Sequence, residues 1–514
     1  MIARKTVLAV LMVVSVAGIA IAAGQRGAQT QGSPEKISLT VFGWVGPYTK
    51  DPVNNYFWKK YEEATGIHAI VEMVPQVSYQ EQVNLRWSSN TLPDVLFKAS
   101  IDVPAFAADG AIVPIDPYLR QYAPNLSRYM AEKPDIERNI KLADGHIYGF
   151  PYLVTASTTQ PKLFVNKKWL DSTGRPMPTT TEELKDLATL FYNSDWNKNG
   201  QKDEIPIMSE YPQMIYKALL GSFGFTAAGS YSESWDIDPA TKRLRYIYAT
   251  DQGRKLLTYL NDLYKNKLIY QEFFTVDIPR FTAEAQQNRI GFAFIHNSLY
   301  LDTAEADFAA LPGPFTGPDG DKNYIGFNSE IGGQTAFITK NNKYPAETVK
   351  WIDYLYSDEG ICLYFMGEKD VTYYIDANGD PQFTDYVRKN PNGMSMEEAL
   401  GNYVIWSGGG NPTVADAKHF ANHLLPQITA DSVANLAPYK PQNVWGSFPF
   451  SQADNERLAI LNTDIGTYVS EMRAKFIRGD ESLNNWNAYV QQLNSMGLRE
   501  LTEIMQRGYD AYSK

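Results

Sequence analysis

The segment that begins at Lys36 alternates between strand-like and helix-like runs, and this constrains the possible folds more than any other feature. Period-two apolar runs predict strands and amphipathic runs predict helices, in the order 36–44 (strand), 54–65 (helix), 69–74 (strand), 79–89 (helix) and 92–97 (strand). Strands separated by helices pair in parallel, with helices covering the sheet. We therefore predict an α/β fold, in which ligands lie at the carboxyl ends of the strands.

The stretch from Asp144 to Tyr152 predicts where the chain leaves this sheet. Asp144 and Gly145 form a two-residue turn signal, and Pro151 disfavours helix at the residue before it. Residues 152–159 carry no charge and no helical period before the next apolar run begins at Leu163. We expect a crossover between two lobes here. The alternative is a core hairpin with ordinary aromatic packing.

The amino-terminal residues have the pattern of a secretory signal peptide. Arg4 and Lys5 precede an uncharged apolar run of sixteen residues, 6–21, which small residues follow. We predict a signal peptide at 1–23 and a flexible mature start at 24–36. An uncleaved anchor is the alternative, although a spanning helix needs about 20 residues. Because the only cysteine is Cys362, no cleavage-site cysteine can carry a lipid, so a soluble periplasmic product is expected.

The length of the chain predicts more than one lobe. About 490 residues remain after the leader, more than a single hydrophobic core normally supports. A single cysteine excludes an intramolecular disulfide, so stability has to come from buried apolar surface. No linker or repeat separates two units, which favours lobes interleaved by several crossovers. The predicted division is 37–155 and 331–400 for the first lobe, and 156–330 and 401–514 for the second.

Charge and aromatic content bear on the class of ligand. The chain has 47 basic and 58 acidic residues, a net charge of −11, which does not favour nucleic acid or anionic membranes as partners. It also has 33 tyrosines and 10 tryptophans. These rigid, amphipathic side chains suit stacking on a neutral polar ligand.

Seven segments, in this order, make the chain similar to the family 1 extracellular solute-binding proteins of ABC-type carbohydrate importers. They are 92–95, 144–151, 164–170, 179–184, 259–264, 351–360 and 486–497. The resemblance implies a two-lobed periplasmic-binding-protein fold, type II-like, that closes on a sugar or oligosaccharide without catalysis. It also implies delivery to ABC transporter permease subunits in the membrane, by a protein that acts as a monomer. Many family members are lipoproteins, and this chain departs from them by lacking the anchor cysteine.

Candidate ligand-binding residues are aromatic platforms and polar side chains at predicted loop positions, because sugar rings have apolar faces and hydroxyl rims. The candidates are Trp44, Tyr48, Asp94, Lys98, Tyr152, His296, Tyr300, Trp406 and Trp445. The resemblance implies that Asp94 borders the ligand cleft. Trp406 and Trp445 stand in Gly- and Pro-rich stretches that are expected to leave an indole exposed. For each single aromatic, core packing is the alternative.

One loop has the spacing of a calcium-binding loop. Oxygen-bearing side chains alternate and a glycine stands at the sharp turn, with Asp195, Asn197, Asn199, Gln201 and Asp203 as candidate ligands of a structural Ca²⁺. The twelfth position holds Pro206 instead of a bidentate glutamate, so closure needs Glu204, a distant carboxylate or water. The alternative is a solvated Asx-rich turn.

Other motifs argue against most catalytic classes. His419 and His423 have the i, i+4 spacing of a zinc site, but Phe420 replaces the glutamate of zinc proteases, which favours an ordinary helix surface. We find no phosphate-binding loop, nucleophile elbow or dinucleotide fingerprint. No cofactor is required. A secreted glycosidase and a peptide-binding protein of similar fold remain the alternatives, because paired carboxylates leave no short signature.

Overall fold

A computed structural model describes residues 36–46, 48–155, 159–407, 409–421 and 426–513. The predicted signal peptide and His423 lie outside the described residues. None of the helices in these ranges combines the length and apolar composition that crossing a membrane requires.

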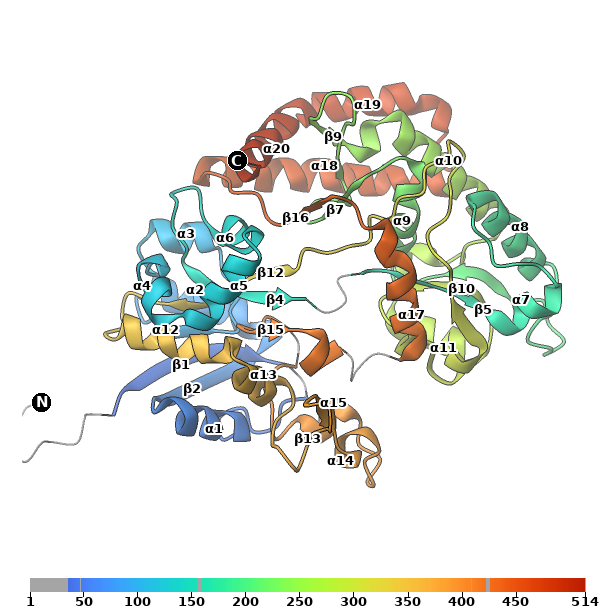
Figure 1. Cartoon of the computed structure of the whole chain (residues 1–514). Coiled ribbons are helices and arrows are strands. Elements are labelled where there is room, and N and C mark those ends of the chain that lie inside the picture. The colour runs from blue at the N-terminus through green and yellow to red at the C-terminus, as the bar shows by residue number, and fades with distance from the viewer. Residues whose placement is uncertain (1–35, 47, 156–158, 408, 422–425, 514) are drawn as a thin grey trace, which may run out of the picture.

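The first lobe is built on a six-stranded sheet in the order β15-β4-β12-β3-β1-β2 (Figure 1). Its strands are β1 (Ser38–Val45), β2 (His68–Pro75), β3 (Val95–Phe97), β4 (Gly149–Val154), β12 (Ile331–Ile338) and β15 (Val414–Ala415). β1 pairs in parallel with β2 and β3, as the alternation predicts, whereas β12 runs antiparallel to its neighbours β3 and β4. The sheet is therefore mixed, because β12 returns from the second lobe.

Helices and a small hairpin complete the first lobe. They are α1 (Tyr56–Thr65), α2 (Gln76–Ser88), α3 (Val103–Ala108), α4 (Asp116–Tyr122), α5 (Pro124–Glu132), α6 (Asp135–Ile140), α12 (Pro345–Asp353), α13 (Asp358–Phe365), α14 (Asp385–Arg388), α15 (Met396–Leu400), β13 (Tyr373–Ile375) and β14 (Pro381–Phe383). The sheet has two buried faces: Val95 and Phe97 point into one apolar cluster, and Leu96 into another. This explains why β3 is apolar throughout rather than alternating.

The second lobe has a four-stranded sheet in the order β11-β5-β10-β6, with two short two-stranded sheets. The strands are β5 (Lys162–Asn166), β6 (Ile205–Met208), β10 (Ile290–Ile295), β11 (Phe308–Ala310), β7 (Ala227–Gly229) with β16 (Asn443–Trp445), and β8 (Trp235–Ile237) with β9 (Leu244–Tyr246). β10 is parallel to β6 and antiparallel to β5, so Ile295 at the carboxyl end of β10 pairs with Lys162 at the start of β5.

The helices of the second lobe are α7 (Lys167–Thr173), α8 (Thr181–Tyr192), α9 (Pro212–Leu220), α10 (Asp251–Lys265), α11 (Ile278–Gln286), α17 (Gln427–Leu436), α18 (Gln452–Arg478), α19 (Trp486–Ser495) and α20 (Leu498–Tyr512). Their ends follow local sequence signals. At α8, Thr180 and Glu183 form the reciprocal capping box that the sequence predicts. Figure 1 shows α18, α19 and α20 together along the top of this lobe.

The chain passes between the lobes several times. β4 leads out of the first lobe towards β5, β12 re-enters it, and the chain leaves again between β15 and α17 (Figure 1). The predicted lobe boundary at residue 400 is too early, because Val414 and Ala415 still pair with Leu153 and Val154 of β4. Repeated passes place the carboxyl ends of β1 and β3 opposite the second lobe.

Candidate functional site

A cavity of about 650 Å³ lies between the lobes. The first lobe supplies Trp44 at the end of β1, residues 99–104 after β3, Asn139 in α6 and residues 141–143 after α6. The re-entering strand supplies Gly332–Thr335, and the second lobe supplies Tyr231 and residues 447–450. A second cavity of about 770 Å³ shares Tyr231, Gly332, Gly333 and Ser447 with it. The two together form a continuous cleft, which we call the interlobe cleft.

Trp44 lies at the wall of this cleft, at the predicted carboxyl end of β1. The side chain is only 4% exposed, and the Lys98 ammonium stands 4.6 Å from the ring centroid. Lys98 Nζ donates to the carbonyl oxygens of Ile405 (2.6 Å) and Ser407 (2.9 Å). Burial lowers the pKa of Lys98 well below its ordinary value. Lys98 is therefore fully buried beneath Trp44 and does not line the cleft.

Asp94 lies away from the cleft, contrary to the prediction. β3 begins at Val95, so Asp94 precedes this strand rather than following it. Its carboxylate accepts hydrogen bonds from the backbone N–H (2.8 Å) and hydroxyl (2.6 Å) of Thr40, near the start of the parallel strand β1. Both residues lie at the amino edge of the sheet. Asp94 thus joins two strands at the end opposite to the cleft.

Three buried polar atoms in the cleft have no hydrogen-bond partner among the described residues: Asn139 Oδ1, Gln334 Oε1 and Thr335 Oγ1. The amide orientations are set by bonds on the other side. Asn139 Nδ2 donates to the Asp135 carbonyl (2.7 Å), and Gln334 Nε2 donates to the Ile140 carbonyl (3.1 Å). Two carbonyl-type acceptors and one hydroxyl are therefore buried beside the cleft without a partner among the described residues.

Aromatic side chains of the second lobe stand opposite these polar atoms. Tyr231 packs on Phe448 with ring centroids 4.8 Å apart, and Phe450 follows at 6.4 Å from Phe448. All three line the cleft. The sequence analysis missed this group. Its only local signal is the stretch 446–450, in which aromatics alternate with glycine, serine and proline.

A second group of predicted residues lies at the carboxyl edge of the second-lobe sheet. The fully buried carboxylate of Glu210 accepts from the backbone N–H of His296 (2.7 Å) and contacts its Nδ1 (2.5 Å). Burial and the nearby Glu210 raise the pKa of Tyr300, and Glu397 of the first lobe contributes to this shift. Lys162 is 4% exposed, and its burial lowers its pKa to about 8. His296 and Tyr300 are therefore brought together at the edge that faces the first lobe.

Three other candidates have different surroundings. Tyr48 is 42% exposed on the surface. Tyr152 is half-buried in β4, and a Cβ added to Gly332 would lie 2.9 Å from its Cδ1. Trp406 is half-buried against the first-lobe core, 6.5 Å from the ring of Phe365. Tyr152 therefore packs beside the glycine pair that borders the cleft.

Trp445 is not an exposed platform. The residue belongs to β16, which pairs in parallel with β7, and its side chain is 2% exposed. Its indole packs against Phe448 (5.5 Å between centroids) and Tyr509 (5.9 Å). The prediction was wrong because the strand that buries Trp445 is formed with a segment more than 200 residues earlier in the chain.

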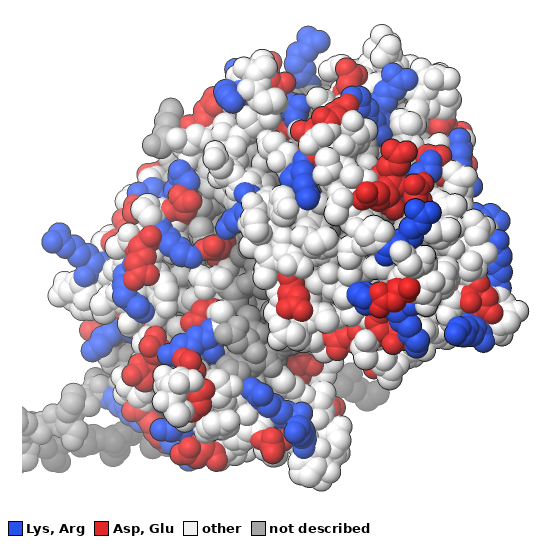
Figure 2. All heavy atoms as spheres, turned by 45° about the vertical axis from the view of Figure 1, so that its right-hand side comes forward, with Lys and Arg blue, Asp and Glu red and all other residues white. Residues whose placement is uncertain are grey.

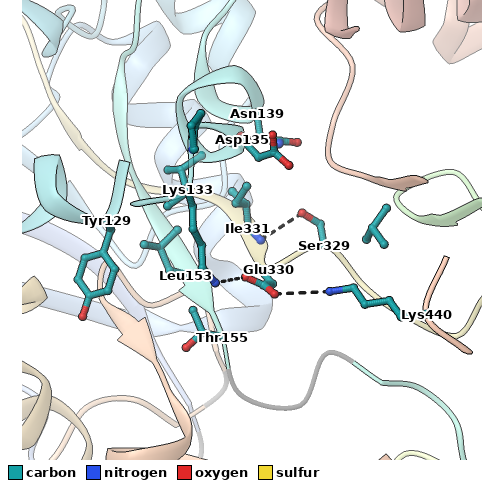
Figure 3. A pocket seen from close by; sticks show the side chains of 13 residues that line it. Tyr129, Lys133, Asp135, Asn139, Leu153, Thr155, Ser329, Glu330, Ile331 and Lys440 are labelled. Atoms are coloured by element: carbon teal, nitrogen blue, oxygen red, sulfur yellow. Dashed lines mark hydrogen bonds and ion pairs between the residues drawn. The ribbon is translucent and has the colours of Figure 1, made fainter. Parts of the chain in front are cut away.

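A cavity of about 280 Å³ lies beside the passage between the lobes (Figure 3). Glu330 lies directly before β12, and its carboxylate pairs with the ammonium group of Lys133 from the first lobe. Lys440 Nζ of the second lobe lies 3.6 Å from Glu330 Oε1. Their side chains are 32–41% exposed, so each ion pair contributes little to stability. The carboxylate nevertheless lies between two cations that belong to different lobes.

In the predicted calcium loop, the side-chain oxygens accept hydrogen bonds from N–H groups of the same loop. Asp195 accepts from the backbone N–H groups of Asn199 (3.1 Å) and Gly200 (2.9 Å), and the side-chain amide of Asn199 donates to Asp203 (3.1 Å). Glu204 Oε1 accepts from the backbone of Trp196 (2.6 Å), whereas its buried Oε2 has no partner among the described residues. The loop thus holds several oxygen donors and one unpartnered carboxylate oxygen, while the side-chain amides of Asn197 and Asn199 donate to Asp203.

In the described ranges, the loop at Asp195 included, no group of three or more His, Cys, Asp or Glu side chains is arranged to hold a metal ion. His419 is buried and its Nδ1 lies 2.9 Å from Asp416 Oδ2. Burial opposes its charged form, but hydrogen bonds with Asp416 and Cys362 outweigh this and raise the pKa of His419 to about 9. His419 is therefore a cation in an ion pair rather than a neutral metal ligand.

The profile of a protein family described as bacterial extracellular solute-binding protein matches residues 46–361. The fructooligosaccharide ABC transporter substrate-binding protein FusA of Streptococcus pneumoniae is 26% identical over 506 residues, covering 93% of this chain and 91% of that protein. The polygalacturonan/rhamnogalacturonan-binding protein YtcQ of Bacillus subtilis is 24% identical over 276 residues, 52% of each chain.

Solved structures share the fold. FusA bound to kestose superposes with a TM-score of 0.73 at 24% identity, covering 93% of this chain and 99% of that one. A solute-binding protein from Bifidobacterium longum infantis, associated with a transporter that binds HMO, gives a TM-score of 0.77 at 21% identity, with the same coverage. These similarities confirm the predicted two-lobed α/β fold.

Proposed function

Because this chain belongs to the bacterial extracellular solute-binding proteins, we propose that it captures an oligosaccharide in the interlobe cleft and delivers it to the permease subunits of an ABC importer. Two relatives support this ligand class, since FusA and YtcQ are named for the glycans they bind. Both cavities are large enough for several sugar rings.

The observation that carries the proposal is the pairing of unpartnered acceptors with aromatic faces in one cleft. Sugar hydroxyls donate hydrogen bonds to carbonyl oxygens such as Asn139 Oδ1 and Gln334 Oε1, and C–H faces of sugar rings pack on aromatic rings. Tyr231 and Phe448 present such rings across the same cavity. A buried acceptor without a partner costs stability, and a ligand hydroxyl offsets this cost.

We propose that the lobes close on the ligand by a hinge movement. The segments expected to take up the change are 152–160 and the pair Gly332-Gly333. Gly333 has a φ of 91° and open space around its α-carbon, so the backbone there adopts conformations that other residues avoid. Glu330, next to this pair, contacts a cation of each lobe.

The protein would act without catalysis, as a monomer exported by its signal peptide to the periplasm. The family membership favours binding over chemistry, and the described part of the chain has no membrane-crossing helix. The loop from Asp195 to Asp203 would hold a structural Ca²⁺, with Glu204 in place of the glutamate missing at the twelfth position. None of its residues lines either cavity of the interlobe cleft, so we assign the ion to stability rather than to ligand binding.

Thermal-shift screening of oligosaccharides, followed by calorimetry and recovery of intact ligand, tests this function. Release of reducing ends over hours would instead identify an enzyme. Thr335→Val removes one unpartnered hydroxyl and should weaken binding by about threefold to tenfold without lowering the melting temperature.

Thr339→Val is the matched control, because Thr339 directly follows β12, the strand that contains Thr335. Thr339 Oγ1 donates to the Pro93 carbonyl outside the cleft, so this variant should lose stability but keep its affinity. If the two variants bind equally well, the unpartnered atoms of the cleft do not contact the ligand.

A further inference from the structure

The charged side chains of the interlobe cleft are few, and both cations among them are already paired. Over both cavities the lining includes two carboxylates and two ammonium groups, Asp102, Glu233, Lys141 and Lys217. Lys217 contacts Glu233 at 2.9 Å, and Lys141 contacts Glu137 at 2.5 Å. Among the residues that line these cavities there is no arginine. The cleft therefore offers no unpaired cation to an anionic ligand.

The remaining polar atoms of the cleft also disfavour a carboxylate. Asn139 Oδ1 and Gln334 Oε1 are acceptors and cannot donate a hydrogen bond to another acceptor. Their donating Nδ2 and Nε2 atoms are turned away, towards Asp135 and Ile140. Hydroxyl groups satisfy these acceptors, whereas a carboxylate in the same position would be repelled and left without a partner.

The second-lobe edge, which lies outside the lining of both cavities, carries a further buried carboxylate. Glu210 is fully buried with Oε2 unpartnered, and Glu397 of the first lobe contributes to the electrostatic surroundings of Tyr300 beside it. Lys162, which interacts electrostatically with Glu210, is itself 4% exposed. Figure 2 shows that acidic and basic side chains are interspersed over the face in view.

Resting on the proposed function, we infer that the interlobe cleft selects uncharged oligosaccharides and rejects uronate oligomers, which carry a carboxylate on every ring. A uronate would have to enter the cleft with its charges unpaired, since every lining cation already has a carboxylate partner. Selection would thus come from the donor and acceptor pattern as well as from charge.

Calorimetry on the full chain tests this with matched trisaccharides. β-1,4-Mannotriose and β-1,4-trimannuronate have the same ring stereochemistry and differ at C6, and neutral fructo-, gluco- and xylo-trisaccharides with trigalacturonate complete the panel. Every uronate should bind at least about tenfold more weakly than the best neutral sugar. The affinity of that neutral sugar should not change between about 0.02 and 0.5 M NaCl. A uronate within tenfold of the best neutral sugar, or a strongly salt-weakened affinity, would overturn the inference.

Glu233→Gln provides a second test, because it frees the Lys217 ammonium beside the cleft without changing the size of the side chain. Glu233 is half-exposed, so the variant should fold. The ratio of trimannuronate to neutral affinity should rise about threefold or more, whereas Lys255→Gln, on the surface pair with Asp319, should leave it unchanged. An unchanged ratio in Glu233→Gln would refute the charge argument. A panel in which no glycan binds at all would refute the proposed function itself, a result distinct from uronate binding.

Discussion

Gly446→Ala is the sharpest test of whether the lobes meet around the ligand as they do in this structure. Gly446 follows β16 in the second lobe and lies against Asn139 of α6 in the first. A Cβ added there would lie 1.1 Å from Asn139 Oδ1 and 2.1 Å from its Cγ. The backbone of Gly446 is outside the left-handed region, so alanine brings no strain of its own. The substitution therefore acts on the contact between the lobes.

The free-energy cost of Gly446→Ala follows from the hydrogen bonds that Asn139 would lose. To make room, its side chain must rotate away from the Asp135 carbonyl (2.7 Å) and the Tyr512 hydroxyl (3.4 Å). Two hydrogen bonds at about 1 kcal/mol each give a cost of about 2 kcal/mol. The alternative, separating the lobes by about 2 Å, loses all of their contact here. Either route should weaken ligand binding roughly thirtyfold.

Calorimetry with the ligand found by screening measures this loss, and a double-mutant cycle identifies its cause. Asn139→Ala removes all three atoms that the new Cβ would meet, so adding Gly446→Ala to it should cost nothing further. Melting curves show whether each variant is folded. If Gly446→Ala costs the same with and without Asn139, or has no effect on affinity, the ligand-bound form does not bring these lobes together in this way.

Three further predictions concern closure, calcium and pH. Small-angle scattering should show compaction on saturation with ligand, and an unchanged radius of gyration with proven binding would contradict a hinge around Gly332-Gly333. Chelation, or Asp195→Ala, should lower the melting temperature, and if neither does so the loop is only a turn. Burial lowers the pKa of Lys162 from 10.5 to about 8, so the folded protein binds fewer protons than the unfolded chain between these values. Urea stability relative to Lys162→Met should therefore rise with pH over this window, by up to about 3 kcal/mol, and a flat difference would show that Lys162 is solvated.

Local signals predicted the elements of the fold well. The strand–helix alternation after Lys36 and the capping box at Thr180 depend on residues a few positions apart, and both are present. The position of Asp94 was wrong because a strand of three residues, Val95–Phe97, leaves no margin for error at its start. Its place at the cleft was implied by the family resemblance, whereas its carboxylate binds Thr40 at the amino edge of the sheet.

The polar atoms of the cleft could not be predicted in this way. Asn139 lies in helix α6 of the first lobe, Gln334 and Thr335 lie on a strand that returns almost 200 residues later, and Phe448 comes from the second lobe. No spacing in the sequence links them, and amides have no motif of their own. Only the packing shows that these acceptors are buried and lack partners.

Lys98 shows how the fold positions the cleft wall. A buried ammonium without a carboxylate partner costs several kcal/mol in desolvation, which a leucine or methionine would avoid. Here the cost is offset by charge-assisted hydrogen bonds to the carbonyls of Ile405 and Ser407 and by the ring of Trp44 above Nζ. These three contacts join β3, the end of β1 and a segment that arrives some 300 residues later. Because the ammonium needs all of them, it fixes Trp44 in one orientation at the edge where the ligand enters.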